Sequence, residues 1–202
     1  KTTMKILLLA DSLDNGGAET HIHELAINLS LLGHFVSVLS NGGNISEQLQ
    51  KKNITQIHYG AFPLKTLYTE ICRIKPDIVH AHTRKTAFMC RVLLTFMEFP
   101  FVFTAHAHFS SKKMKDSFSF FPKQTIAVSR DIAHHLVKSF GVSRDSVSII
   151  ENGINIAKFC PKRNNDRRFR IVMISRMDHD CSLGAHLLCQ IAPALYKKFP
   201  DL

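Results

Sequence analysis

Residues 5–40 read KILLLADSLDNGGAETHIHELAINLSLLGHFVSVLS, and this stretch decides the fold. The apolar run at 5–10 is typical of a buried strand, and apolar residues at helical spacing begin directly after Gly16 and Gly17. Adjacent glycines let the backbone turn sharply and approach another group closely. A helix that starts there turns unpaired N–H groups outward, which suits a phosphate or a carboxylate. The alternative is a tight strand–helix turn without a ligand, and these residues alone leave both open.

Apolar runs and helical stretches alternate along the rest of the chain. Further strands are expected at 34–40, 54–59, 78–81, 101–105, 125–128, 147–150 and 169–175. Helices are expected between them, at 18–32, 45–52, 64–74, 84–97, 130–140 and 183–198. Ser129 is a suitable N-cap, and Gly33 and Gly141 are suitable helix stops. This alternation predicts an α/β fold, a Rossmann-like parallel sheet with helices on both faces.

One polar, charged stretch interrupts this pattern and predicts a domain boundary. Residues 155–168 include a proline and many charges, as in an interdomain linker. We therefore expect an N-terminal domain at 1–154 and the first strand and helix of a truncated second Rossmann-like domain at 169–202.

Composition narrows the range of partners. The formal charge of +10, from 26 basic and 16 acidic residues, favours an anionic partner. No basic helix with reader residues and no RNA-binding sheet motif occurs, so nucleic acid is not expected. The five cysteines are scattered without a CxxC pair, which argues against a disulfide framework and a zinc ribbon. No apolar run approaches the roughly 20 residues of a membrane span, and the N-terminus lacks a signal pattern. We expect a cytoplasmic protein.

Two His-x-His pairs stand at predicted strand ends, where open α/β sheets bind ligands. They are His80 with His82 and His106 with His108. Residues two apart on a strand share a face, so each pair could ligate a metal ion, and a metal-dependent hydrolase is an alternative function. Against it, no HExxH motif occurs and no carboxylate stands beside either pair. We predict no metal: His80 is structural, and His82 and His106 hydrogen-bond a polyhydroxylated substrate.

With these stretches the chain resembles the retaining glycosyltransferases of family 4, which have the GT-B fold of two facing Rossmann-like domains. The resemblance is carried, in the family's order, by GGAETHIHELAINLSLLGHFVSVLS, KPDIVHAHT, FVFTAHAHF, IAVSRDIAHHLVKSFGV, VSIIENGINIAKF and RIVMISRMD. It implies an enzyme that moves a sugar from a nucleotide-diphosphate sugar to an acceptor hydroxyl with retained configuration and without a metal cofactor.

The resemblance also implies roles for individual residues. Gly16 and Gly17 would approach the donor phosphates, Arg176 would pair with the diphosphate leaving group, and His106 would be catalytic, in contact with the donor sugar near the reacting carbon. Further residues would line the acceptor side or shape the loops that face the cleft: Glu19, His82, Thr83, Ser129, Asn152 and Gly153.

Two departures from the family pattern concern the second domain. Cys181 and Ser182 stand near the places where the family has a lysine and a glycine that grip the diphosphate. The family's paired-glutamate motif would lie beyond residue 202, so we expect the chain to be a fragment that is inactive or weakly active alone. An acceptor-binding half that needs a partner chain is the alternative. UDP, GDP and ADP donors remain open, as do a lipid-linked glycan, a polysaccharide precursor and a small molecule as acceptor.

Residues 108–123 interleave lysines with apolar residues, a pattern shared by interfacial membrane segments and by loops that cover a core. The membrane interpretation implies an anionic membrane surface as a partner, with the protein peripheral on the inner face of the plasma membrane. The apolar residues of 183–198 need a partner surface, which implies a homodimer in the absence of a complete second domain.

Overall fold

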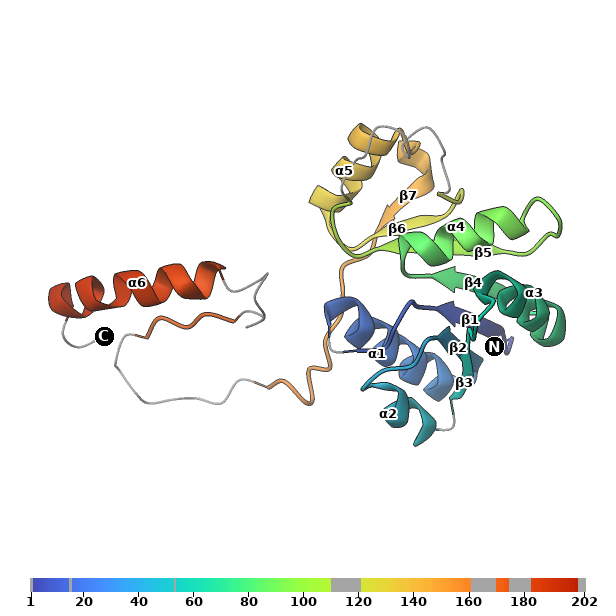
Figure 1. Cartoon of the computed structure of the whole chain (residues 1–202), viewed down its shortest axis with the longest axis horizontal. Helices are drawn as coiled ribbons and strands as arrows, with labels where there is room; N and C mark the ends of the chain where they lie inside the picture. Colours follow the sequence, from blue (N-terminus) through green and yellow to red (C-terminus); the bar gives the residue numbers. More distant parts are fainter. Residues whose placement is uncertain are drawn as a thin grey trace. The chain divides into compact units, whose positions relative to one another are not determined.

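The computed structural model describes residues 2–14, 16–52, 54–109, 121–160, 170–174 and 183–199. The chain divides into two compact units, Lys1–Gly153 and Ile154–Leu202 (Figure 1). Among the described residues, no helix has the length and apolar character needed to cross a membrane.

The first unit is a seven-stranded sheet in which every neighbouring pair is parallel, in the order β3-β2-β1-β4-β5-β6-β7. Its strands are β1 (Lys5–Leu9), β2 (Phe35–Ser40), β3 (Thr55–His58), β4 (Ile78–Ala81), β5 (Phe101–Ala105), β6 (Thr125–Ala127) and β7 (Val147–Ile149). Its helices are α1 (Gly17–Leu31), α2 (Ser46–Gln50), α3 (Pro63–Ile74), α4 (Arg84–Leu93) and α5 (Arg130–Phe140), with a 3-10 turn at Arg144–Ser146. The predicted parallel α/β sheet is confirmed.

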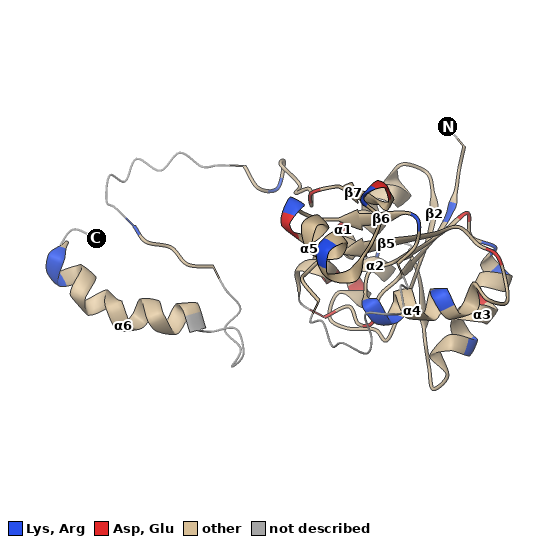
Figure 2. Ribbon diagram, turned by 90° about the horizontal axis from the view of Figure 1, so that it is seen from above, with Lys and Arg blue, Asp and Glu red and all other residues tan. Residues whose placement is uncertain are grey.

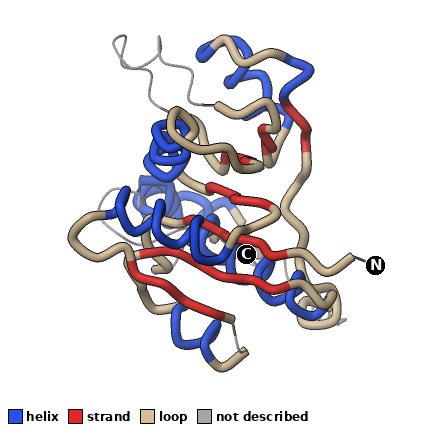
Figure 3. Tube along the Cα trace, turned by 90° about the vertical axis from the view of Figure 1, so that its right-hand side faces the viewer, coloured by secondary structure: helices blue, strands red, loops and turns tan. Residues whose placement is uncertain are grey.

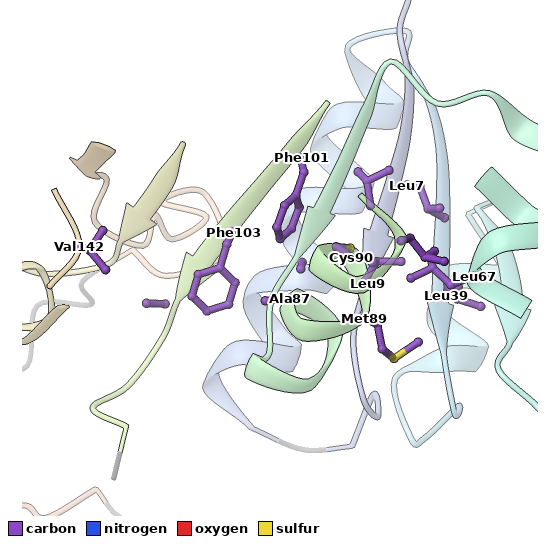
Figure 4. Close-up of a cluster of buried hydrophobic side chains, with 14 of the residues drawn as sticks. Leu7, Leu9, Leu39, Leu67, Ala87, Met89, Cys90, Phe101, Phe103 and Val142 are labelled. Atoms are coloured by element: carbon purple, nitrogen blue, oxygen red, sulfur yellow. The ribbon is translucent and has the colours of Figure 1, made fainter. Parts of the chain in front are cut away.

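Helices cover both faces of the sheet, which has a hydrophobic core on each side (Figures 1 and 3). Successive strand residues point to opposite faces. Accordingly Ile6 and Leu8 of β1 join a core under α1 and α2, whereas Leu7 and Leu9 join a core under α3, α4 and α5. Figure 4 shows part of the second core, where Cys90 of α4 lies beside Leu9 of β1 and Phe103 of β5 lies toward Ala87 of α4. Burial on both sides explains the continuous apolar strands.

The helix boundaries follow the expected local signals. The Ser129 hydroxyl accepts a hydrogen bond from the Ile132 N–H at the start of α5. Gly33 and Gly141 have φ values of 92° and 64° after α1 and α5, in the left-handed region that favours glycine. Thr83 caps α4 by a reciprocal pair of bonds with Thr86. These caps set where each helix begins relative to the sheet edge.

The strand order reverses between β1 and β4, and this positions the site. From β1 the chain proceeds through α1 to β2 on one side, whereas β4 lies on the other side and leads to β5. Connections therefore diverge at this point, and the carboxyl ends of β1 and β4 meet where no connection covers them. Ligands of open α/β sheets bind at such a switch point.

The second unit contains α6 (Leu183–Lys198), as predicted. The strand expected at 169–175 is a wrong prediction for its described part, because residues 170–174 form no strand. A strand needs a neighbour to pair its N–H and C=O groups, and the structure describes no other strand in this unit. Arg176, Cys181 and Ser182 lie outside the described residues.

Candidate functional site

Histidines from three elements meet at the switch point of the sheet. His82 directly follows β4, His106 directly follows β5, and His21 lies in α1. The Nδ1 atom of His82 lies 3.1 Å from Nε2 of His106, within hydrogen-bond distance. The His21 ring centroid lies 4.9 Å from that of His106 and 5.7 Å from that of His82. We call His21, His82 and His106 the histidine cluster.

Backbone pairing explains why these side chains converge. Leu9 of β1 is in register with Ala81 of β4, and the His82 N–H donates to the Leu9 carbonyl at 3.1 Å. Strand β5 pairs with β4 on the other side, so His106 follows next along the same edge. His80 supports the cluster from within the sheet: its Nε2 lies 2.7 Å from the Thr104 hydroxyl, and its ring lies 4.1 Å from that of His82. This is the structural role predicted for His80.

The cluster is electrically neutral near neutral pH. Burial, reinforced by the neighbouring His21, lowers the pKa of His106 to about 4. Burial lowers the pKa of His80 to about 3, and it holds the pKa of His82 well below its usual range. Burial also lowers the pKa of His21. Neutral imidazoles carry one donor and one acceptor nitrogen each, so the cluster is suited to hydroxyl groups rather than to forming ion pairs.

Two buried ring nitrogens of the cluster are unpaired within the described part of the chain. His82 Nε2 and His106 Nδ1 are buried and have no hydrogen-bond partner among the described residues. A buried polar atom without a partner costs free energy. His82 is only 4% exposed, whereas His106 is partly exposed. The rings of His106 and His21 are therefore the members that a hydroxyl-bearing ligand can reach, and His82 is bonded to the Nε2 atom of His106.

The cluster also has the geometry of a potential metal site. One ring nitrogen from each of the three histidines lies within 4.8 Å of the others. Ligands on a tetrahedral zinc are about 3.3 Å apart, and three histidines are a known zinc donor set. This potential site takes one histidine from each of the two His-x-His pairs and adds His21, so it differs from the metal sites that the sequence suggested. His80 bonds Thr104, and His108 turns away to bond Asp131 at 2.6 Å and to stack on His135.

The two glycines are not required by the backbone. Gly16 is the N-cap of α1 with φ −166°, which is extended backbone that any residue adopts. A Cβ added to Gly17 would meet no atom within 4 Å. The carboxylate of Glu19 lies beside Gly16, where an added Cβ would collide with it. The start of α1 is thus open at Gly17, whereas the Glu19 carboxylate occupies the space beside Gly16.

The remaining predicted residues have local roles or lie apart. Thr83 and Ser129 are N-caps that fix the starts of α4 and α5. Asn152 and Gly153 are exposed after β7, and no described contact joins them to the cluster. Our prediction missed His21, which lies one helical turn after Gly17 on the same side of α1. That spacing is the signal that could have identified it.

Residues 108–123 are described only at their ends, and both ends support the loop interpretation. Phe109 and Phe121 pack against the core under α5. The Arg84 guanidinium lies 5.3 Å from the Phe109 ring centroid and 5.4 Å from that of Phe140. Phe109 and Phe121 therefore cover the core at the two ends of this segment. Residues 110–120 lie outside the described residues.

The lowered pKa values predict a pH-dependent stability. The unfolded chain takes up protons on its histidines near pH 6.5, whereas folded His80 and His106 titrate at about 3 and 4. Between these values the unfolded state binds more protons, so the free energy of unfolding should fall as pH is lowered from 6.5 toward 4, by up to about 1.4 kcal/mol per pH unit for each histidine. Urea unfolding at pH 7, 6 and 5 measures this slope. His80→Gln should reduce the slope and a substitution of the exposed His134 should not; equal slopes would contradict the prediction.

Comparisons with known proteins give one family. A sequence profile of Glycosyltransferase Family 4 matches residues 15–158. The A subunits of phosphatidylinositol N-acetylglucosaminyltransferase from Arabidopsis thaliana and Homo sapiens are each 26% identical to this chain, over 98% and 93% of it. The matches cover 51% and 44% of those proteins, so the chain spans about half the length of these relatives.

Solved structures agree on the fold. A glycosyltransferase from Rickettsia africae aligns with 78% of this chain and 45% of its own, at a TM-score of 0.67 and 23% identity. The Anabaena protein HepE, solved in complex with UDP and glucose, aligns with 76% of this chain and 46% of its own, at a TM-score of 0.62 and 20% identity. These likenesses confirm the predicted Rossmann-like half of a GT-B fold.

Proposed function

Because the chain belongs to glycosyltransferase family 4, we propose that the histidine cluster and the start of α1 take part in sugar transfer from a nucleotide-diphosphate sugar to an acceptor hydroxyl, with retained configuration. One observation carries this proposal. His21 of α1 lies against His106, so a helix start suited to phosphate and a neutral ring suited to hydroxyls share one edge. A nucleotide sugar presents both kinds of group.

The chemistry follows from these two parts. The N–H groups and positive dipole end at Gly17 stabilise the diphosphate as negative charge develops on it. The free Nδ1 of His106 bonds a sugar hydroxyl near the reacting carbon, and His82 holds the ring from its other side. A leaving phosphate oxygen accepts the acceptor proton as the new glycosidic bond forms. We propose that Arg176 also pairs with the diphosphate, as in the family pattern.

The relatives support specific substrates. Their names specify transfer of N-acetylglucosamine to phosphatidylinositol, and HepE was solved with UDP. We propose UDP-N-acetylglucosamine as donor and an inositol phospholipid as acceptor, with a whole protein about twice the length of this chain. That these relatives are named as subunits also supports a partner chain.

Gly17 provides the sharpest test of the donor site. Since nothing lies within 4 Å of an added Cβ, Gly17→Ala and Gly17→Val should leave the melting temperature nearly unchanged. A diphosphate that approaches the helix start would instead meet the new side chain, and the donor KM should rise stepwise, by about tenfold for valine, which is about 1.4 kcal/mol. Initial rates at varied UDP-N-acetylglucosamine test this in the full-length protein. An unchanged KM in a folded Gly17→Val variant would remove the helix start from the donor site.

We also propose that transfer requires no metal. His82 Nδ1 and His106 Nε2 are already joined by a hydrogen bond, which an ion bound to these two nitrogens would have to displace. Activity should therefore survive EDTA and phenanthroline, and elemental analysis should find less than stoichiometric zinc. Zinc that chelators remove together with activity would instead favour a metal-dependent hydrolase at the three histidines.

A further inference from the structure

We propose that the outer side of α3 and α4 docks on the surface of an anionic lipid bilayer. The inference rests on the proposed function in one respect: docking would give the enzyme access to a lipid acceptor. Vesicle binding can be measured without sugar transfer, so the two can fail separately.

The outer side of α3 and α4 carries large apolar side chains that the core does not use. In α3, Leu67 and Ile71 are buried in the core, while Tyr68 is 47% exposed. Phe62, directly before α3, is 71% exposed. The full set that we call the α3–α4 face consists of Phe62, Leu64, Tyr68, Phe88 and Phe96, together with the basic residues Lys65, Arg73, Lys85 and Arg91.

Helices α3 and α4 lie on the same side of the sheet, so these residues share one face of the first unit. Leu67 and Ile71 of α3 and Ala87 and Cys90 of α4 belong to the same core cluster under one sheet face. Both helices therefore turn their opposite sides to solvent on the same face of the unit. Leu64 and Tyr68 are one turn apart on α3, which places them together along the helix.

Charge distinguishes this layer from the one on the other sheet face. Helices α3 and α4 contain five basic residues and one acidic residue, Glu70, which bonds Arg73. Helices α1 and α2 contain three glutamates and no lysine or arginine. Figure 2 shows the basic segments on α3 and α4. The layer with exposed aromatic residues is thus the layer that attracts an anionic surface.

This composition favours a bilayer over a protein partner. Exposed aromatic and aliphatic residues flanked by lysine and arginine are typical of interfacial membrane binding, in which each basic residue adds attraction to anionic lipids. Protein interfaces are instead depleted of lysine at their centres. Lysine stems can also lie along apolar surface while the ammonium group stays in water.

The position of the α3–α4 face also suits a lipid acceptor. Phe62 and Thr83 stand at the starts of α3 and α4, and Thr83 directly follows His82 of the histidine cluster. Both helices therefore begin at the sheet edge that carries the cluster. Docking through their outer side would bring this edge near lipid headgroups.

Co-sedimentation with vesicles tests the proposal on the full chain. Phosphatidylcholine vesicles are compared with vesicles that also contain phosphatidylinositol or phosphatidylserine. The wild type should bind both anionic compositions at least tenfold better than the neutral one. Phe62→Ser/Tyr68→Ser and Lys65→Glu/Arg91→Glu should each lower anionic binding about tenfold. The matched control is Leu31→Ser/Leu32→Ser, which removes two exposed leucines at the end of α1 and should bind like the wild type.

Several results would overturn the docking surface. They are equal binding to neutral and anionic vesicles, no binding, undiminished binding of both α3–α4 variants, or a loss confined to Lys112→Glu/Lys113→Glu/Lys115→Glu. A loss of transfer to vesicle-borne acceptor with unchanged transfer to a soluble acceptor would support docking. Vesicle binding without any sugar transfer by the full-length protein would contradict the proposed function and would still support the docking surface.

Discussion

His106→Ala should lower turnover at least tenfold in the full-length protein while the fold remains intact, a loss of about 1.4 kcal/mol or more in transition-state stabilisation. The reason is geometric: His106 is one of the two partly exposed members of the histidine cluster, with His21, and its Nδ1 has no partner among the described residues. Initial rates of nucleoside diphosphate release measure the effect, and circular dichroism checks the fold. His106→Gln, which keeps a donor and an acceptor, should retain more activity than alanine.

His108→Ala is the matched control for this experiment. His108 is two residues further along the chain, but its ring bonds Asp131 and stacks on His135, away from the cluster. Its loss should change turnover less than threefold, or less than about 0.7 kcal/mol. Equal losses for both alanine variants, or unchanged turnover in His106→Ala, would remove His106 from the reaction.

Gly43→Ala should lower the free energy of unfolding by about 3 kcal/mol, the largest stability effect we expect from one methyl group. Gly43 has φ 141°, and an added Cβ would lie 2.4 Å from the Leu13 carbonyl carbon. The colliding atoms are backbone and cannot turn aside. The Leu13 N–H donates to the Gly42 carbonyl at 2.7 Å, and the Leu13 carbonyl accepts from Ile45 at 2.9 Å. These two hydrogen bonds join the loop after β2 to the loop that leads into α1.

Gly33→Ala is a control that measures the cost of a positive φ without a collision of the added Cβ. Gly33 also has a positive φ, but an added Cβ would meet no atom within 4 Å. Its substitution should cost only about 1 kcal/mol. Urea unfolding of both variants measures the difference, and equal losses would mean that contact with Leu13 has no effect on stability.

Much of the architecture could be predicted because it depends on local patterns. Continuous apolar runs at 5–10 and 101–105 require burial on both faces, and the caps at Ser129 and Gly141 act within a single turn of helix. The edge that carries His82 and His106 followed from the rule that ligands bind at the carboxyl ends of parallel strands.

The grouping of the histidines could not be predicted, because it depends on where each strand ends. Alternation places residues two apart on one face only within a strand. Strand β5 ends at Ala105, so His106 and His108 are already outside it and diverge. The spacing of His21 from Gly17 indicates only its side of α1, because its contact with His106 also depends on how α1 packs against the sheet. The expected strand at 169–175 depended on neighbours in the same way.

The central claim is that the histidine cluster contacts the donor sugar, and side-chain NMR of the histidines tests it most directly. Resonances in the ¹H–¹⁵N spectra of the full-length protein can be assigned from His→Gln variants and followed as UDP-N-acetylglucosamine is added. We expect the ring nitrogens of His106 and His21 to shift to saturation, while those of His108 and His135, which stack on each other, stay unchanged. Saturable donor binding that leaves His106 unshifted, or that shifts His108 and His135 instead, would contradict the account.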